Sequence, residues 1–367
     1  MAVTGIEVNN YLMFKGEFTI NFGPGINVII GGNGTGKTTL LRHMFSSTSS
    51  YAFQLRKYAA SLEHLDSENH SIRITSIPDL FTRNITKCNS ENRAASQPSF
   101  NVEYLITSNG INAFKTCVPE DPIDEAFIAS DTEENKQRAV LREHVYRYTT
   151  LEDYVMIPDT EMLSHSKGLL ALHYQRVMPF DKTEIDILAK AQLPITREIK
   201  PNASKILSLL RGIIGGEVVY ENDEFFMLRD NGLKIPYSLE ASGNKKLGLL
   251  WKILRNGLLE SESILFWDEP ESSLNPEVFP TLANILLELS RNSVQVFVAT
   301  HSELFASYLS VNRVKGDKVM FYSLYKDDDK IKVDTSDRFD LLDPNPLTDS
   351  STNLYKAELE KGLGGNG

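Results

Sequence analysis

The N-terminal region alternates apolar and polar residues with the two-residue period of a half-buried strand. The alternation ends in FTINF, passes a Gly-Pro-Gly turn at 23–25, and gives way to a short, mainly apolar β-branched run, INVII, at 26–30. This pattern predicts a hairpin that leads into a fully buried strand. A helix should then follow the glycine-rich segment 31–36, because the apolar residues of TTLLRHMF at 38–45 share one helical face.

The second half of the chain has apolar strand candidates that alternate with helix candidates. YVMIP at 154–158, ILFW at 264–267 and VQVFV at 294–298 are candidate core strands, and a helix over 280–291 separates the last two. Strand, helix and strand in this order predict a parallel α/β core. Further helices are expected over 168–177, 203–214 and 242–257, and further strands over 217–221, 224–230 and 233–238.

The region from about 51 to 150 differs from its surroundings, since polar loops separate less regular apolar segments there. NVEYLIT at 101–107 and INAFKTCV at 111–118 are joined by a Ser-Asn-Gly turn, which predicts a hairpin. A helix is expected over 132–148, but it lacks the sustained heptads of a long coiled-coil arm. We therefore expect an inserted mixed subdomain.

The expected domain plan follows from these patterns. Residues 1–50 and 151–345 form a head, and 51–150 form the insert. Residues 346–367 form a C-terminal segment whose GLGGNG end should be a flexible tail.

Composition narrows the function classes. The chain has 367 residues, is 41% hydrophobic, and carries 38 basic and 49 acidic residues for a net charge of −11. This balance gives no indication of a nucleic-acid-coating surface, although it leaves room for a local basic patch. No apolar run is long enough for a membrane helix, so we expect a cytoplasmic protein without a membrane partner. The two cysteines, Cys88 and Cys117, indicate neither a disulfide framework nor a zinc site.

The segment GGNGTGKT at 31–38 matches the phosphate-binding pattern G-x-x-x-x-G-K-[ST] in full, between an apolar strand and a helix. Its glycines let backbone N–H groups surround phosphate oxygens, and the helix N-terminus favours negative charge. Lys37 should reach the β- and γ-phosphates of ATP, and the Thr38 hydroxyl should ligate Mg²⁺. The residues expected to contact the nucleotide here are Gly31, Asn33, Gly34, Thr35, Gly36, Lys37, Thr38 and Thr39.

Two acids end the apolar run ILFWDE. Burial of this strand puts Asp268 and Glu269 at its carboxyl end, where a parallel sheet presents its ligands. Asp268 should hold Mg²⁺ and Glu269 should polarise the attacking water.

Together these motifs resemble the ABC/SMC-like ATPases that include the Rad50, RecF and OLD proteins. DEPESSLNP at 268–276 looks like their joined Walker B motif and D-loop, and VATHS at 298–302 resembles their switch strand, with His301 in the γ-phosphate-sensing position. EASGNK at 240–245 resembles a degenerate signature motif and assigns Ser242 and Gly243 to a partner's nucleotide. The resemblance implies a P-loop NTPase of ABC-ATPase-head type with a mixed β-sheet core.

The signature residues also have a physical rationale. Ser242 can cap a helix whose free N–H groups face the γ-phosphate in a partner chain, or it can be a plain N-cap.

Three further segments leave alternatives open. The family's Q-loop is not recognisable, and 157–161 is the best candidate for it. Phe14 and Lys15 either flank the adenine or, for the aromatic ring, belong to the core. The acidic triplet at 327–329 is better read as a charged hairpin turn than as part of a nuclease site, because only 66 residues follow His301.

The resemblance implies an ATPase switch in which ATP joins two heads as a homodimer with shared ATP sites and hydrolysis releases them. A stand-alone head of this kind is similar to the anti-phage defence ATPases of PARIS and Septu, which implies a separately encoded nuclease or toxin as effector. Two other classes stay open: a DNA-repair or DNA-tethering head, and a transporter ATPase subunit.

Overall fold

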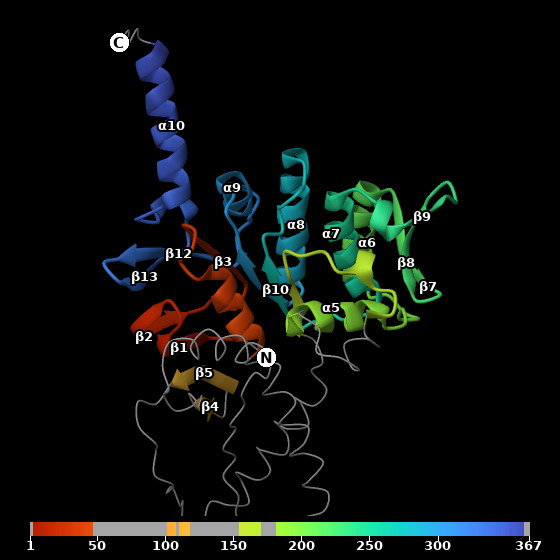
Figure 1. Ribbon diagram of the computed structural model, residues 1–367, viewed down its shortest axis with the longest axis horizontal. Coiled ribbons are helices and arrows are strands. Elements are labelled where there is room, and N and C mark those ends of the chain that lie inside the picture. The colour runs from red at the N-terminus through yellow and green to blue at the C-terminus, as the bar shows by residue number, and fades with distance from the viewer. Residues whose placement is uncertain (1–2, 47–100, 108–109, 118–153, 170–180, 363–367) are drawn as a thin grey trace, which may run out of the picture.

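The computed structural model describes residues 3–46, 101–107, 110–117, 154–169 and 181–362. The helix expected over 132–148 and most of the one expected over 168–177 lie outside these residues. Figure 1 shows a central sheet, a group of helices and strands to one side of it, and a second sheet below it.

The central sheet has six strands in the order β13-β12-β3-β11-β10-β6. All neighbours are parallel except β13, which is antiparallel to β12. The expected mixed sheet of a P-loop NTPase is therefore confirmed. The strands are β3 (Ile26–Gly31), β6 (Tyr154–Ile157), β10 (Ile264–Asp268), β11 (Gln295–Ala299), β12 (Val319–Asp327) and β13 (Lys330–Ser336).

Successive residues of the central strands pack into two different cores. In β10, Leu265 and Trp267 point to one side and Ile264 and Phe266 to the other, and all four are buried. The first side is covered by helices that include α8 (Phe279–Arg291) and α9 (Glu303–Val311). The second is covered by the helix at 37–46 and by the N-terminal strands. Strands buried on both faces explain the continuous apolar runs in the sequence.

The N-terminal hairpin forms part of a second sheet in the order β2-β1-β5-β4. β1 (Gly5–Tyr11) and β2 (Phe14–Asn21) are antiparallel, as expected, and β5 runs parallel to β1. The hairpin predicted in the 51–150 region is β4 (Asn101–Thr107) and β5 (Gly110–Cys117). This hairpin is hydrogen-bonded to the head's own N-terminal strand, while the domain boundaries remain predictions.

A helical lobe lies beside the central sheet (Figure 1). It contains α5 (Lys182–Gln192), α6 (Pro201–Ile214) and α7 (Ser242–Arg255). A three-stranded antiparallel sheet of β7 (Gly216–Glu221), β8 (Glu224–Arg229) and β9 (Lys234–Pro236) connects α6 to α7. α7 packs on both α6 and β7, so this sheet and the helices form one unit.

The C-terminal segment holds α10 (Pro346–Gly362), a helix that the sequence patterns did not indicate. It projects away from the body in Figure 1, and Leu354, Tyr355 and Leu359 on it are exposed. Its weak apolar periodicity explains why no helix was expected there.

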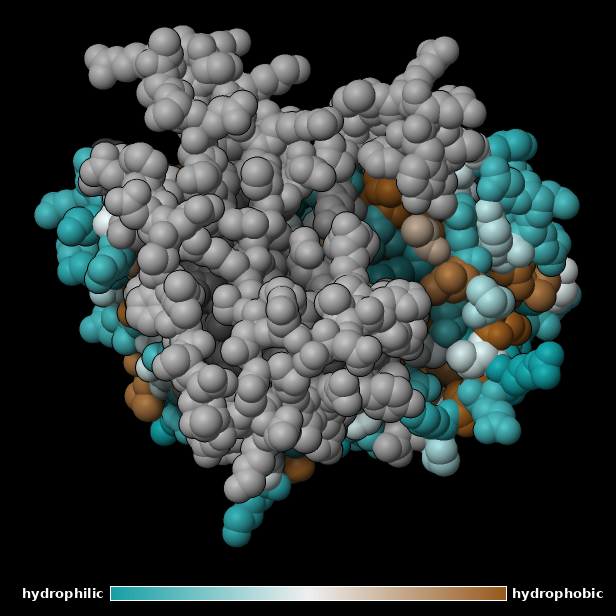
Figure 2. Space-filling view, turned by 90° about the horizontal axis from the view of Figure 1, so that it is seen from below, coloured by the Kyte–Doolittle hydropathy of each residue, from teal (hydrophilic) through white to brown (hydrophobic). Residues whose placement is uncertain are grey.

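Figure 2 shows one face of the molecule by hydropathy. Seen from below, the described residues at both flanks are mostly hydrophilic, with apolar residues scattered among them (Figure 2). Among the helices that the structure describes, none combines the length and the apolar character that a bilayer crossing needs.

Candidate nucleotide-binding site

The glycine-rich loop joins the end of β3 to the helix that begins at Lys37. Gly36 has φ +95°, and a Cβ there would lie 2.7 Å from Cζ of the buried Phe14 ring, so only glycine lets the loop close onto the core. Lys37 Nζ donates to the carbonyl oxygens of Gly31 at 2.8 Å and Gly32 at 3.1 Å. The Lys37 side chain therefore folds back over the loop and is held by hydrogen bonds to the loop's own carbonyl groups.

The remaining loop residues differ in exposure. Thr35 is buried and its hydroxyl donates to the Gly32 carbonyl at 2.9 Å, which braces the loop from within. Asn33 and Gly34 are exposed, and Thr38 and Thr39 are half-buried.

The Lys37 ammonium is in an unfavourable environment for a charge. Burial lowers its pKa to about 8, although the nearby carboxylates of Glu269 and Asp268 act in the opposite direction. A polyphosphate would supply the missing negative charge at this position.

Asp268 is the last residue of β10, and the side chain is 4% exposed. Burial raises the pKa of Asp268, while a hydrogen bond from Thr38 opposes the shift. Its Oδ1 is buried and has no hydrogen-bond partner among the described residues. A buried, unpaired carboxylate oxygen beside a threonine hydroxyl fits Mg²⁺, which takes one or two protein oxygens and completes its shell with phosphates and water. No group of three or more His, Cys, Asp or Glu side chains suited to a metal occurs in the described ranges.

Glu269 and His301 face each other beside the loop. His301 Nε2 lies 3.6 Å from Glu269 Oε1, and both side chains are about one-third exposed. Burial and the Lys37 charge lower the pKa of His301, while Glu269 opposes the shift, so a neutral imidazole is favoured. Glu269 has φ +48°, a conformation that L-residues adopt at a cost, and its N–H donates to the Ala299 carbonyl at 2.9 Å.

Glu271 is a residue whose role the sequence reasoning missed. It is buried, and its Oε1 accepts hydrogen bonds from the Thr300 hydroxyl at 2.5 Å and the His301 N–H at 3.2 Å. Burial raises its pKa, and the hydrogen bond from Thr300 opposes the shift. Glu271 therefore ties the turn after β10 to the loop that carries His301. The sequence signal that could have indicated this role is an acidic residue among the small polar residues of the segment that resembles a D-loop.

The structure corrects one detail of the signature segment. α7 begins at Ser242, but its N-cap is Ala241 and no side chain caps the helix. Glu240 accepts hydrogen bonds from the Ala241 N–H at 3.0 Å and the Asn244 side chain at 2.9 Å, so the turn is organised from the preceding residue. Ser242 lies in the first turn of the helix and its side chain is exposed.

The surroundings of Ser242 and Gly243 bear on whether they serve the loop of their own chain. No hydrogen bond joins either residue to 31–38 in the part of the chain that the structure describes. Gly243 packs instead on the turn after β10, where an added Cβ would lie 2.9 Å from the Ser273 carbonyl oxygen.

Lys246, which the motif comparison also missed, connects α7 to the site. Its Nζ donates to Asp159 Oδ1 at 2.9 Å, to the Glu269 carbonyl at 2.7 Å and to Ser272 Oγ at 2.6 Å. Asp159 belongs to 157–161, the candidate Q-loop. Burial raises the pKa of Asp159, but hydrogen bonds from Lys246 and Ser272 outweigh it and leave that pKa below its usual value. Helical spacing puts Lys246 on the buried face with Leu250 and Ile253. A lysine on the apolar face of a predicted helix is the sequence signal that could have indicated a buried role for Lys246.

Two segments with open alternatives in the sequence are Phe14, a candidate adenine contact, and the acidic triplet at 327–329. Phe14 is 1% exposed and packs against Phe18 with ring centroids 4.6 Å apart, so its ring belongs to the core. The acidic triplet at 327–329 ends β12 and forms the turn into β13, as expected for a charged hairpin turn. Its acids are partly neutralised, since Lys15 pairs with Asp329 at 3.0 Å and Lys332 pairs with Asp327.

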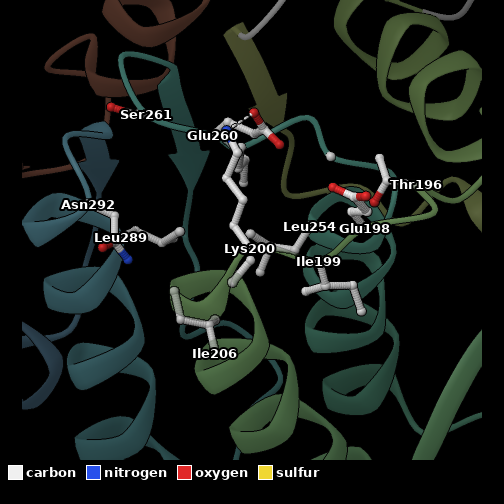
Figure 3. A pocket seen from close by; sticks show the side chains of 13 residues that line it. Thr196, Glu198, Ile199, Lys200, Ile206, Leu254, Glu260, Ser261, Leu289 and Asn292 are labelled. Carbon is white, nitrogen blue, oxygen red and sulfur yellow. Dashed lines mark hydrogen bonds and ion pairs between the residues drawn. The ribbon is translucent and has the colours of Figure 1, made fainter.

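A separate small pocket lies between α6, α7 and α8 (Figure 3). Its walls include Leu254 and Leu289, and an ion pair between Lys200 and Glu260 lies at one side. These residues lie near the ends of α7 and α8 that lead into β10 and β11. The pocket is therefore at the amino edge of the sheet, opposite the phosphate-binding loop.

Two family models match the chain. The family described as "AAA domain, putative AbiEii toxin, Type IV TA system" matches residues 118–307, more than half of the chain, and a second AAA domain model matches residues 6–144. The chain belongs to the first of these families. This makes it a member of a P-loop ATPase family, and a P-loop of this kind binds ATP. Lys37 lies within the second match, and Asp268, Glu269 and His301 lie within the first.

Solved structures with a related shape include SMC heads and ABC cassettes. An SMC head bound to the C-winged helix domain of ScpA is 14% identical, covers 92% of this chain and 98% of its own, and has a TM-score of 0.46. The SMC head domain from Thermotoga maritima is 13% identical, with 92% and 99% covered and a TM-score of 0.41. The ADP conformation of MJ1267, an ATP-binding cassette of an ABC transporter, is 14% identical, with 89% and 85% covered and a TM-score of 0.37. No curated protein matches the chain.

Proposed function

We propose that this chain is an Mg²⁺-dependent ATP-hydrolysing switch that pairs head-to-tail with a second copy. In this proposal Lys37 binds the β- and γ-phosphates, and Thr38 and Asp268 hold the metal ion. Glu269 polarises the attacking water, and His301 contacts the γ-phosphate. The Mg²⁺ ion would neutralise charge on the transferred phosphoryl group when bound.

The observation that carries this proposal is the meeting of four side chains at one sheet edge. β3, β11 and β10 are parallel neighbours, so the residues that follow them come together at their carboxyl ends. Lys37 follows β3, His301 follows β11, and Asp268 with Glu269 ends β10. The electrostatic effect of both carboxylates on Lys37 agrees with this placement.

Exposure supports the pairing of two copies. Ser242 is exposed at the start of α7, and its neighbour Leu239 is 76% exposed. A helix N-terminus beside an exposed apolar side chain is suited to contact a second protein that carries an anion. The phosphates bound to a second copy of this chain are such an anion.

We further propose that the ATP-bound pair controls a separately encoded nuclease or toxin in bacterial anti-phage defence. The family description, which names a putative toxin of a type IV toxin–antitoxin system, supports a toxin-associated role. The exposed apolar residues of the projecting α10 offer a surface for such a partner.

Two variants test the ATPase. Lys37→Ala should lose ATP binding while its melting temperature changes little, because among the described residues the hydrogen bonds of Lys37 Nζ go to loop carbonyls. Glu269→Gln should bind ATP but hydrolyse it about 10² to 10⁴ times more slowly, and should remain dimeric on a sizing column with ATP and Mg²⁺. Wild-type hydrolysis by Glu269→Gln, or wild-type ATP affinity in Lys37→Ala, would contradict the proposal.

The effector is tested with the trapped dimer. Glu269→Gln with ATP serves as bait for the product of the neighbouring gene, and Lys37→Ala serves as the matched control. ATP-dependent capture followed by a nuclease or growth-inhibition assay supports effector control. Equal capture by both variants contradicts an ATP-dependent switch.

A further inference from the structure

Lys246 is a buried charge that joins three segments of the head. It is 6% exposed, and its ammonium donates to a side chain after β6, to the backbone of Glu269, and to a side chain in the turn that follows. The second and third of these acceptors belong to the segment that carries the proposed catalytic base. A buried lysine with three good acceptors is firmly held, and its removal leaves Asp159 without its cation.

We propose that Lys246 is a positioning residue that couples the helix contacting the partner's nucleotide to Glu269 in its own ATP site. This inference rests on the proposed function, because it needs Ser242 at the partner's γ-phosphate and Glu269 as the base. It adds a consequence: ATP bound by one chain adjusts the hydrolytic geometry of the other.

The link is short and stiff. Lys246 comes four residues after Ser242, so one helical turn separates the two, and backbone hydrogen bonding begins with the Lys245 N–H to the Ala241 carbonyl at 3.0 Å. Gly243 also lies so close to the Ser273 carbonyl that an added Cβ would clash at 2.9 Å. The first turn of α7 and the turn after β10 therefore move together.

The receiving end is sensitive to displacement. Glu269 has φ +48°, and such a conformation persists only when its surroundings hold it. Its carbonyl oxygen accepts from Lys246 Nζ at 2.7 Å and from the Ser272 N–H at 3.1 Å. Loss of Lys246 removes one of these two hydrogen bonds. The backbone of Glu269 is then held less firmly, and the direction of the Glu269 carboxylate depends on that backbone.

Asp159 completes the junction. Its Oδ1 accepts from both Lys246 Nζ at 2.9 Å and Ser272 Oγ at 2.8 Å, so the three side chains form a closed triangle of hydrogen bonds. A shift of α7 thus reaches the candidate Q-loop and the base at the same time.

The test substitutes Lys246→Met and compares it with Lys252→Met. Lys252 lies on the same helix and is 4% exposed, and in the described part of the chain no hydrogen bond or ion pair joins it to these groups, so it controls for the loss of a buried lysine. For Lys246→Met we expect kcat to fall about 10- to 100-fold, because a misplaced base loses that much, while ATP affinity stays within about twofold of wild type. The Hill coefficient for ATP hydrolysis should fall from above 1 in the wild type to 1. Lys252→Met should keep both the wild-type kcat and the wild-type Hill coefficient.

Ser272→Ala keeps the inference testable if Lys246→Met does not fold. It removes one acceptor of the junction without leaving a buried charge, and it should lower kcat several-fold at unchanged ATP affinity. A wild-type kcat and Hill coefficient in either variant would overturn the coupling, as would equal losses in Lys252→Met. If the wild-type chain itself fails to hydrolyse ATP, the proposed function fails instead, so the two failures are distinguishable.

Discussion

Three acidic residues, Asp268, Glu269 and Glu271, lie close together in the sequence at the end of β10. They differ in burial, and burial determines whether each can contact a cation or a water molecule. Asp268 and Glu271 are buried, and each has one carboxylate oxygen without a partner among the described atoms. Glu269 is about one-third exposed and open to water. A buried unpaired carboxylate is costly until a cation or proton arrives, whereas an exposed one can meet a water molecule. This division agrees with Asp268 at the metal ion and Glu269 at the nucleophile.

The pKa of Lys37 predicts how ATP affinity depends on pH. Burial lowers that pKa to about 8, and the protonated amine is the form that binds phosphate. The affinity should therefore be constant below about pH 7.5 and fall roughly tenfold by about pH 9, as the free protein loses the proton that the complex keeps. Titration calorimetry across this range measures it. Lys37→Arg stays charged throughout, so its affinity should not change with pH, and a flat profile for the wild type would contradict the prediction.

At the scale of elements, two helical glycines should respond in opposite ways to alanine. A Cβ at Gly248 of α7 would lie 2.7 Å from the Tyr237 hydroxyl oxygen, which is fixed by its hydrogen bond to the Lys245 carbonyl at 2.6 Å. Gly248→Ala should destabilise by about 1–3 kcal/mol through overpacking. A Cβ at Gly212 of α6 would meet no described atom within 4 Å beyond its own stretch of helix, so Gly212→Ala should stabilise by about 0.5–1 kcal/mol.

Thermal or urea unfolding of the two variants measures whether each substitution raises or lowers the free energy of unfolding. Tyr237→Phe added to Gly248→Ala removes the clashing oxygen and should recover part of the loss. If Gly248→Ala proves as stable as the wild type, α7 does not pack as tightly on Tyr237 as the structure describes.

The elements also show how far sequence patterns reach. Motif spacing and apolar runs predicted β3, β10 and β11 and the two acids at the end of β10, because strands buried on both faces leave a clear signal. The same patterns missed α10, whose exposed residues show little periodicity. They also missed the contacts of Lys246 and Glu271, because the partners of these residues lie far away in the sequence. The only local sign of Lys246 is a charge among apolar residues, and the only local sign of Glu271 is a charge among small polar residues. The prediction that Ser242 caps α7 was wrong, because Ala241 is the N-cap and Glu240, two residues before Ser242, organises that turn.

At the scale of the whole molecule, the position of α7 determines whether one chain can complete an ATP site. Its N-terminus packs on the turn after β10, and its exposed Ser242 makes no hydrogen bond to its own loop among the described residues. A two-fold pairing would bring each α7 to the loop of the partner and create two equivalent sites. Every site would then use Lys37, Asp268, Glu269 and His301 from one chain and Ser242 from the other.

This arrangement predicts complementation between two inactive variants. Lys37→Ala removes the phosphate-binding lysine, and Ser242→Arg places a bulky side chain at the face that the partner's nucleotide would occupy, so each homodimer has two damaged sites. In the mixed dimer, one site carries both lesions and the other carries neither. An equal mixture forms mixed dimers in about half of the pairs, so up to about a quarter of the wild-type ATPase rate should return. A mixture of Lys37→Ala with Glu269→Gln is the matched control, because both lesions fall on the loop side of the site and every site in the mixed dimer stays damaged. Full activity of Ser242→Arg alone, or an inactive mixture in which mixed dimers are seen by native mass spectrometry, would show that the two chains do not share their sites.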